Sequence, residues 1–428
     1  MCPGVYSFTG YKEQGMRLVR SIGLLAVCSL PGLMHAQFDF TIAGRPVQVH
    51  SFASQGFAYS NDNNYLTMDT SQGSFNLTDV GANISMRVTD KLRIGAQIYD
   101  RDFGQLGKWH PQLDWATADY RFKDWFGVRG GKVKTTLGLY NDTQDMDFLR
   151  VFAFLPQGVY PTDLRDSTIA HTGGDVYGTL SLKRAGSLQY TVFAGHRQDS
   201  LYSGYQYMLG SAGINYTSYG GLQYGADLRW NTPFRGLTVG ATDMRADITG
   251  TGTWTYSNAY FGLPGSTTTP TEEHSKNDRT YQLYGQYTKG NLTLDAEYRR
   301  YWRDQIIFSG MGEVETDVRA WYVAASYRLT RRIGVGAYYS RFTNPWSENF
   351  VGVPSQSAAQ SDPGQHEYDK VVALRYDLTK NFYVKVEGHF MDGYGTIGMY
   401  PDGFYSNNNP QGLQPKTNAF IVRAGVNF

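Results

Sequence analysis

Two groups of charged residues could line a polar channel if the fold places them around water. The first occupies segments in which polar and apolar residues alternate, and comprises Lys132, Lys134, Arg121, Asp119, Arg93 and Arg229, with Arg101, Arg375 and Lys385 as further basic candidates. The second lies in the stretch 139–173 and comprises Asp145, Asp147, Arg150 and Arg165. A basic wall facing acidic residues across a channel would create a field that orients dipolar solutes. Taken singly, each residue could instead serve in a structural ion pair of small energetic value.

The elements that would position these charges are strands of about ten residues with polar–apolar alternation. Very short links and long links follow one another in turn between these strands, a pattern typical of transmembrane barrels. Seven short links, near residues 90, 124, 185, 233, 290, 331 and 380, predict sixteen strands if both chain ends lie on the same side. The expected strands are 47–60, 74–89, 91–103, 111–123, 126–138, 174–183, 187–198, 221–231, 236–249, 279–289, 291–303, 318–329, 332–342, 367–378, 381–391 and 416–428.

Alternation within each expected strand assigns its two faces. In 291–303, Leu292 and Leu294 alternate with Thr293 and Asp295, and in 416–428 the charged Arg423 falls between apolar neighbours. A charged side chain on the lipid face costs about 2–4 kcal/mol at the bilayer midplane, so the polar positions are expected to face the lumen. The predicted fold class is therefore all-β: a 16-stranded antiparallel transmembrane β-barrel with short periplasmic turns and long external loops.

Composition agrees with one large closed structure. The chain has 428 residues, of which 49 are Gly and 33 are Tyr, and no linker-like segment divides it. A mean hydropathy of −0.43 excludes a bundle of membrane-spanning helices, although not a barrel whose strands are half polar. The residues 47–428 are thus expected to form the barrel. A soluble β-sandwich is the alternative, and it would carry its polar faces outside.

The start of the chain resembles an export signal. Basic residues near Met16 precede a short apolar run from Ile22 to Leu33, which is too short to span a bilayer as a helix, and a stretch resembling a cleavage site ends at Ala36. We expect 1–36 to be an N-terminal extension plus a signal peptide that is removed, with 37–46 as a short periplasmic segment. Cys2 and Cys28 both precede the expected cut, so no thiolate metal site is predicted, and lipidation at Cys28 is an alternative. No motif indicates a cofactor or a metal.

The final strand, NAFIVRAGVNF at 418–428, resembles the C-terminal signal of outer-membrane proteins, which ends in an aromatic residue and is read by the barrel-insertion machinery. The segment 88–140, with VTDKLRIGAQIYDRDFG and GKVKTTLGLYN, resembles uncharacterised porin-like proteins similar to the phosphate-selective and related anion porins. This resemblance implies a homotrimer in the Gram-negative outer membrane, in contact with lipid and lipopolysaccharide. The resemblance of the final strand implies insertion through Phe428.

The link 139–173 is the outstanding one. In classical sixteen-stranded porins the corresponding loop folds into the barrel and narrows it, and the apolar run from Phe148 to Pro156 would suit packing against an inner wall. We therefore expect 139–173 to be an inward constriction loop; a lid or a trimer contact is the alternative. The other long links, 199–220, 250–278, 343–366 and 392–415, are expected to be external loops, with an extra hairpin expected in the first.

Passive diffusion of small hydrophilic solutes is the function that this pattern predicts. Asp119, Asp227, Asp295, Glu297 and Glu387 interleave with the bases, which argues against a dedicated phosphate path and leaves a weak anion preference or a general pore. The net charge of +1 gives no reason to expect a nucleic-acid partner. No enzymatic activity is expected; the alternatives are a barrel hydrolase and a non-conducting adhesin or receptor.

Overall fold

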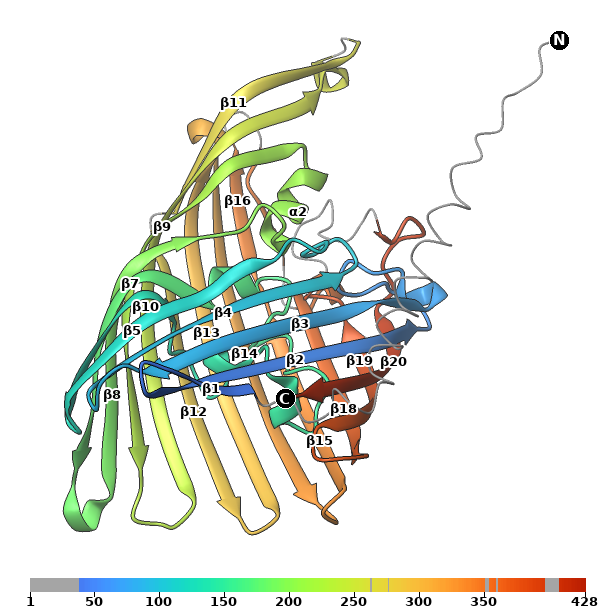
Figure 1. Cartoon of the computed structure of the whole chain (residues 1–428). Coiled ribbons are helices and arrows are strands. Elements are labelled where there is room, and N and C mark those ends of the chain that lie inside the picture. Colours follow the sequence, from blue (N-terminus) through green and yellow to red (C-terminus); the bar gives the residue numbers. More distant parts are fainter. Residues whose placement is uncertain (1–37, 262–263, 276, 351–353, 359–360, 397–407) are drawn as a thin grey trace.

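The computed structural model describes residues 38–261, 264–275, 277–350, 354–358, 361–396 and 408–428. Its strands form one twenty-stranded antiparallel sheet (Figure 1). The expected signal peptide, the cut near Ala36 and both cysteines lie outside the described residues.

Sixteen of the twenty strands close into a barrel, and the other four, β1, β11, β16 and β17, are additions to it. The seam is the pair β2–β20, in which Phe52 lies opposite Asn427 and Ser60 opposite Ala419. The backbone of Phe428 also exchanges hydrogen bonds with Ser51, at 2.8 and 3.2 Å. The barrel strands are β2 (Arg45–Ser60), β3 (Ser74–Arg87), β4 (Leu92–Phe103), β5 (Gln112–Lys123), β6 (Phe126–Lys134), β7 (Ala170–Ser181), β8 (Ser187–Gln198), β9 (Ile214–Asn231), β10 (Leu237–Ser257), β12 (Asp278–Lys289), β13 (Leu292–Ile307), β14 (Gly312–Arg328), β15 (Ile333–Thr343), β18 (His366–Asp377), β19 (Phe382–Gly393) and β20 (Lys416–Asn427).

The predicted fold class is confirmed. All seven predicted short links join neighbouring strands at one end of the barrel, from the turn between β3 and β4 to the turn between β18 and β19. The long links gather at the other end, which we call the outer end. Strand bounds differ from the predicted ones mainly beside the long links. For example, β9 and β10 extend well past the predicted 221–231 and 236–249, because their backbones keep pairing beyond the barrel.

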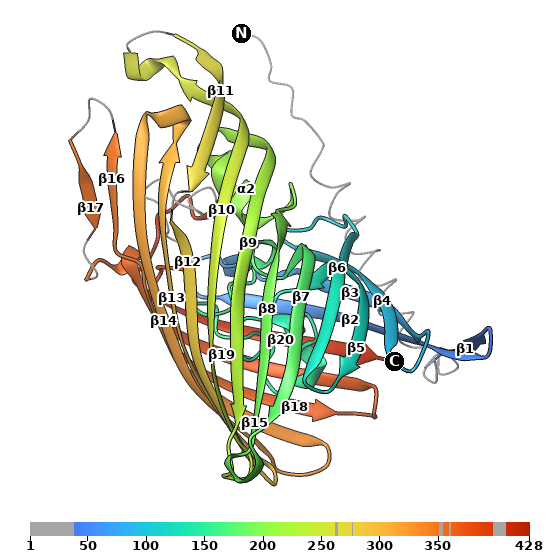
Figure 2. The same ribbon diagram turned by 90° about the vertical axis from the view of Figure 1, so that its left-hand side faces the viewer.

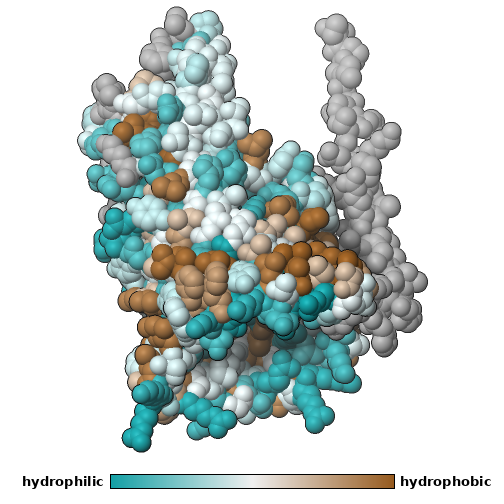
Figure 3. Space-filling model, turned by 60° about the vertical axis from the view of Figure 1, so that its left-hand side comes forward, coloured by the Kyte–Doolittle hydropathy of each residue, from teal (hydrophilic) through white to brown (hydrophobic). Residues whose placement is uncertain are grey.

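The side chains are distributed as expected for a barrel in lipid. Large apolar side chains are exposed on the outside, among them Ile84, Leu228, Leu294 and Phe420, which alternate with buried polar side chains on the inside. Figure 3 shows hydrophobic residues gathered in a band across one face, between more hydrophilic regions. This distribution is the reverse of a soluble sandwich. Among the described residues, no helix is both long and apolar enough to cross a bilayer.

Three of the expected external loops carry structure that extends the sheet or covers it. Strand β10 continues to Ser257 and pairs with β11 (Ser266–Ser275), while β16 (Trp346–Phe350) pairs with β17 (Gln356–Ala358); Figure 2 shows both hairpins at the outer end. A further short strand, β1 (Phe38–Ile42), pairs with the start of β2.

The expected extra hairpin in 199–220 was wrong, because part of this link is the helix α2 (Gly204–Ser211). The side chain of Ser203 caps its first turn by accepting from the backbone N–H of Gln206 at 3.3 Å. Tyr205, Met208 and Leu209 have the spacing of one helical face and pack with Tyr219, Ile248 and other residues of β9 and β10. This face is buried, which stabilises a helix too short to persist alone.

Candidate functional site

The link between β6 and β7, residues 135–169, reaches across the interior of the barrel, and we call it the inner loop. Its residues contact side chains of β5, β13, β19 and β20, which stand on different sides of the closed sheet. A segment that touches all of these walls lies inside them (Figures 1 and 2). The loop begins and ends four residues earlier than the expected 139–173, because β6 stops at Lys134 and β7 begins at Ala170.

The apolar part of the inner loop packs against an apolar patch of the barrel's inner wall. Phe152, Leu155, Val159 and Tyr160 form one cluster with side chains of β14, β15 and β18, namely Val318, Ala320, Tyr322, Ala324, Tyr338, Phe342, Val371 and Ala373. In the β13–β14 register Tyr322 lies opposite Glu297 and Ala320 opposite Arg299, so these apolar side chains share the inward face with the charged ones. Burial of apolar surface there stabilises the loop's position by roughly 25 cal/mol per Å².

A group of charged residues, the Asp147 cluster, fixes the loop to the strands beside the seam. The ammonium of Lys385 lies 3.2 Å from the Asp147 carboxylate and also donates to the backbone carbonyls of Asp147 and Phe152 at 2.6 and 2.8 Å. Tyr383 donates to the same carboxylate. Arg423 approaches it at 3.5 Å and pairs with Asp79 at 2.6 Å. Burial alone would raise the pKa of Asp147, but Lys385 and Arg423 outweigh it and hold that pKa well below its usual value.

A second group, the Lys134 cluster, ties the loop to the strands β4, β5 and β6. Lys134 lies 2.8 Å from Asp145, Arg165 lies 2.6 Å from Asp114, and the amide of Gln97 donates to Asp145 at 2.5 Å. Burial would raise the pKa of Asp145, yet Lys134 and Arg165 together hold it below its usual value. Both loop carboxylates are therefore anions at neutral pH, each paired with cations of the barrel or the loop.

Glu297 on β13 makes a third set of contacts between the inner loop and the wall. Its carboxylate accepts from the Tyr160 hydroxyl at 2.7 and 2.8 Å, from the backbone N–H of Leu139 at 3.0 Å and from the hydroxyl of Tyr322 at 2.5 Å. Two of these donors belong to the loop and one to the wall. The buried Glu297 thus joins the loop to the sheet through several hydrogen bonds.

The structure brings some predicted site residues together and leaves others apart. Lys134, Asp145 and Arg165 meet in the Lys134 cluster and Asp147 lies in the Asp147 cluster. Arg150 donates to the carbonyls of Thr143 and Gln144, within the loop.

The remaining predicted residues lie outside these clusters. Lys132 donates to the backbone carbonyl of Leu113 at 2.6 Å. Arg121 lies 3.4 Å from the exposed Asp124 near a short turn. Asp119 accepts from Tyr177, Arg93 donates to Ser85 at 3.0 Å, and Arg229 donates to the carbonyl of Gly138 at 3.0 Å.

Sequence reasoning missed Asp79 and Asp114 as charge partners of the clusters. Asp79 directly precedes the alternating run 80–88 and falls on the same face as Gly81 and Asn83. Alternation could therefore have placed its side chain inside the barrel. Asp114 sits beside a β-bulge, where the register shifts between Gln97 and Ile98. A bulge changes which side chains face inward, and alternation cannot reveal it in advance.

The inner loop divides the space within the barrel. A cavity of about 1470 Å³, open to solvent, lies on its outer side and is called the outer cavity. On the side of the short turns lie two cavities of about 910 and 1080 Å³. A small cavity of about 390 Å³, called the arginine cavity, lies between the outer cavity and the turn-side cavities. It is lined by Arg101, Arg150, Arg165 and Arg423 together with Asp79 and Asp145. It shares Phe154 with the outer cavity, and Arg150 and Leu155 with one turn-side cavity.

Solved outer-membrane barrels share this architecture. The chain resembles outer-membrane-expressed OmpT of Vibrio cholerae (TM-score 0.53, 13% identity, 91% of this chain and 100% of that one). It resembles Salmonella typhi OmpF in complex with Daunomycin equally well (TM-score 0.53, 13% identity, 91% and 100%). An anion-selective porin from Comamonas acidovorans follows (TM-score 0.51, 12% identity, 90% and 100%). At these identities the likeness concerns the fold. No protein-family model and no curated protein sequence matches the chain.

Proposed function

We propose that this protein is an outer-membrane porin through which small hydrophilic solutes diffuse passively past the inner loop. The observation that carries the proposal is the series of cavities from the outer end to the short turns. Consecutive members of this series share lining residues, and the member of smallest volume is lined by four arginines and two aspartates. Charged rings of this kind set selectivity in known channels.

A weak preference for anions is part of the proposal. Four arginines and two aspartates line the arginine cavity. Three of these arginines are paired with carboxylates: Arg101 with Asp166, Arg165 with Asp114, and Arg423 with Asp79. Arg150 instead donates to two backbone carbonyls, so its charge is compensated least directly. This balance supports a modest excess of positive potential and gives no support to a dedicated phosphate path.

The location and assembly that we propose follow from the outer surface and the comparisons. The exposed apolar side chains would contact lipid and lipopolysaccharide, and Phe428 at the end of the seam strand would be read by the insertion machinery. OmpT of Vibrio cholerae, solved in a trimer form, has the same fold (TM-score 0.51, 14% identity). We propose a homotrimer for this chain as well.

The surroundings of the buried histidine of β19 argue against this residue as the base of a barrel hydrolase. His389 meets Asp369 through Nδ1 at 2.7 Å and Glu387 through Nε2 at 2.9 Å. With both ring nitrogens engaged by carboxylates, this imidazole has no nitrogen left to activate a nucleophile, as the base of a hydrolase must.

Single-channel recording in planar bilayers tests the proposal. The purified protein should give open steps in groups of three, and a KCl gradient should give a reversal potential of the sign for weak anion preference. Arg150→Gln should move that potential toward cation preference, while Arg121→Gln, at an exposed residue near a turn, should leave it unchanged. A protein that inserts as a folded barrel and never conducts would contradict the proposal.

A further inference from the structure

Three arginines line the outer cavity, and two of them form ion pairs with carboxylates. Arg197 lies 2.7 Å from Asp199, and Arg303 lies 2.8 Å from Asp278. Arg299 differs from both: among the residues that the structure describes, no carboxylate lies within ion-pair distance of it. Its Nη1 donates to the carbonyl of Val159 at 2.7 Å, and its Nε has no partner.

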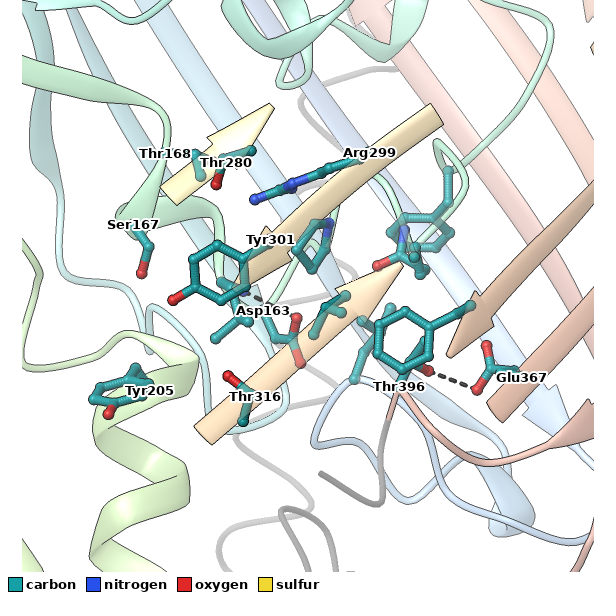
Figure 4. Close-up of a pocket in the computed structure, with 18 of the residues that line it drawn as sticks. Asp163, Ser167, Thr168, Tyr205, Thr280, Arg299, Tyr301, Thr316, Glu367 and Thr396 are labelled. Carbon is teal, nitrogen blue, oxygen red and sulfur yellow. Dashed lines mark hydrogen bonds between the residues drawn. The ribbon is translucent and has the colours of Figure 1, made fainter. Parts of the chain in front are cut away.

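A buried guanidinium with unused donors is an incomplete arrangement. Arg299 is only 8% exposed, and an ionised group taken out of water is costly unless a counter-charge and hydrogen bonds replace the water. Thr280 on the neighbouring strand β12 also lines the cavity, is fully buried, and has a hydroxyl without a partner. Figure 4 shows the guanidinium of Arg299 and the side chain of Thr280 pointing toward one another. Together they offer donors that suit a carboxylate, which guanidinium binds with two parallel hydrogen bonds.

The rest of the lining is largely apolar. Phe154 from the inner loop and Val318, Phe342, Met391 and Ile421 from the strands all border the outer cavity. The ring of Tyr301 lies beside the Arg299 guanidinium, with its centroid 6.0 Å away. A fully hydrated inorganic anion would gain nothing from this surface, whereas an apolar body attached to a carboxylate would bury area against it.

Carboxylates on another part of the lining limit the total charge of such a solute. Glu367 accepts from Thr396 at 2.6 Å, and Asp369 accepts from His389 at 2.7 Å. Both border the same cavity as Arg299, and Figure 4 shows Glu367 and Arg299 on different strands around it. A second negative charge on the solute would face these acidic side chains, and it would find no free guanidinium, because Arg197 and Arg303 already pair with carboxylates.

We propose that the outer cavity binds small apolar monocarboxylates, with the carboxylate held by Arg299 and Thr280 and the apolar body against Phe154, Phe342 and their neighbours. The inference rests on the proposed porin function, because the solute would bind in the outer cavity before it diffuses past the inner loop. The site would favour entry of organic acids over that of inorganic anions.

Two measurements on the full-length folded protein test this site. Isothermal titration in detergent should show saturable binding of 3-phenylpropionate, with weaker binding of 3-phenylpropanol, of succinate and of inorganic phosphate. Arg299→Gln should weaken the binding of 3-phenylpropionate by about tenfold to hundredfold, which is the value of a lost charge-assisted hydrogen bond. Arg299→Lys, which keeps the charge and loses the planar fork, should fall in between. In bilayers, 3-phenylpropionate added on the side of the long loops should reduce the current of the wild type more than that of Arg299→Gln.

The matched control is Arg300→Gln, which removes the same charge one position along β13. Arg300 pairs with Asp317 at 2.7 Å and, by alternation, faces away from Arg299, so its replacement should leave binding unchanged. Equal affinity of the wild type and Arg299→Gln for 3-phenylpropionate would overturn the inference, as would tighter binding of phosphate than of 3-phenylpropionate. If the channel conducts in either case, the proposed porin function still stands. Binding without conductance would support the site and overturn the porin function.

Discussion

The inner loop and the outer hairpin of β10 and β11 are both long links, yet their backbones are satisfied in different ways. In the hairpin, residues from Thr249 to Ser257 pair one by one with His274 to Ser266, so the link carries its own hydrogen-bond ladder beyond the barrel. In the inner loop, charged side chains of the wall supply partners instead: Glu387 accepts from the N–H of Ala153 at 2.6 Å, and Lys385 donates to the carbonyl of Phe152. A long link therefore stays inside the barrel when side chains of the wall can satisfy its backbone.

The largest effect is expected from breaking the Asp147 cluster. Asp147→Ala leaves the buried Lys385 without its carboxylate, and removal of one partner of a buried pair costs about 3–5 kcal/mol. The inner loop should detach from the seam strands, which would raise single-channel conductance and open-channel noise and expose the loop to protease.

The matched control for that change removes both partners. In Asp147→Leu with Lys385→Met no unpaired charge remains in this pair, and Arg423 keeps Asp79 at 2.6 Å. The double variant should therefore lose less stability than Asp147→Ala, as replaced buried pairs often do. A double variant as noisy and as protease-sensitive as the single one would show that the ion pair itself is not what holds the loop.

The second effect concerns the apolar contact between the loop and the wall. Phe152 is 6% exposed and packs edge-on to Tyr338, with ring centroids 5.1 Å apart. Phe152→Ala should cost about 3 kcal/mol through lost burial and the cavity left behind. Thermal unfolding followed by circular dichroism measures it. Leu149→Ala, in the same loop but 58% exposed, is the control and should change the melting temperature little.

A third, smaller effect is expected from acid. Because the pKa values of Asp145 and Asp147 in the folded protein lie below their unfolded values, these groups contribute stability above the unfolded pKa of about 3.9. That contribution is lost only as the pH falls through the lower folded values. Between pH 7 and pH 5 these two carboxylates should therefore contribute no change in conductance or noise. A step in conductance within that range, absent from Asp147→Leu with Lys385→Met, would contradict the assigned pairing.

The smallest effect is expected at the outer hairpin. Replacing residues 256–267 by Asn-Gly should keep the ladder up to Thr255 and Thr268, because such a pair forms a two-residue turn. The replacement spares Trp254, which packs against the same cluster as Leu164 of the inner loop, so the loop's anchoring should change by less than about 0.5 kcal/mol. The same protease and noise measurements as for Asp147→Ala check this, and an effect as large as that variant's would remove the contrast between the two links.

The sequence predicted much of the fold and less of the site. The seven short links, the closure near Phe428 and the inward side of Arg423 and Glu297 all follow from alternation, and the structure has them. The helix α2 was missed because its eight residues form a helix only where Tyr205, Met208 and Leu209 are buried on the sheet. Lys132 and Lys134 were grouped by spacing, but only Lys134 reaches the loop carboxylate Asp145.

The amino-acid sequence was enough to specify the barrel, because polar and apolar residues alternate along each strand. Only a sheet with one apolar and one polar face accommodates this alternation. It also determined which link is exceptional, since an apolar run between aspartates suits neither water nor a strand in lipid. The tertiary structure alone decided which cation meets which carboxylate. Those partners come from strands far apart in the sequence, as with Asp147 and Lys385 or Glu297 and Tyr160, and only closure of the sheet brings them within hydrogen-bond distance. Arg299 emerged in the same way: sequence alternation turns it inward, but only the packed barrel leaves its Nε without a partner.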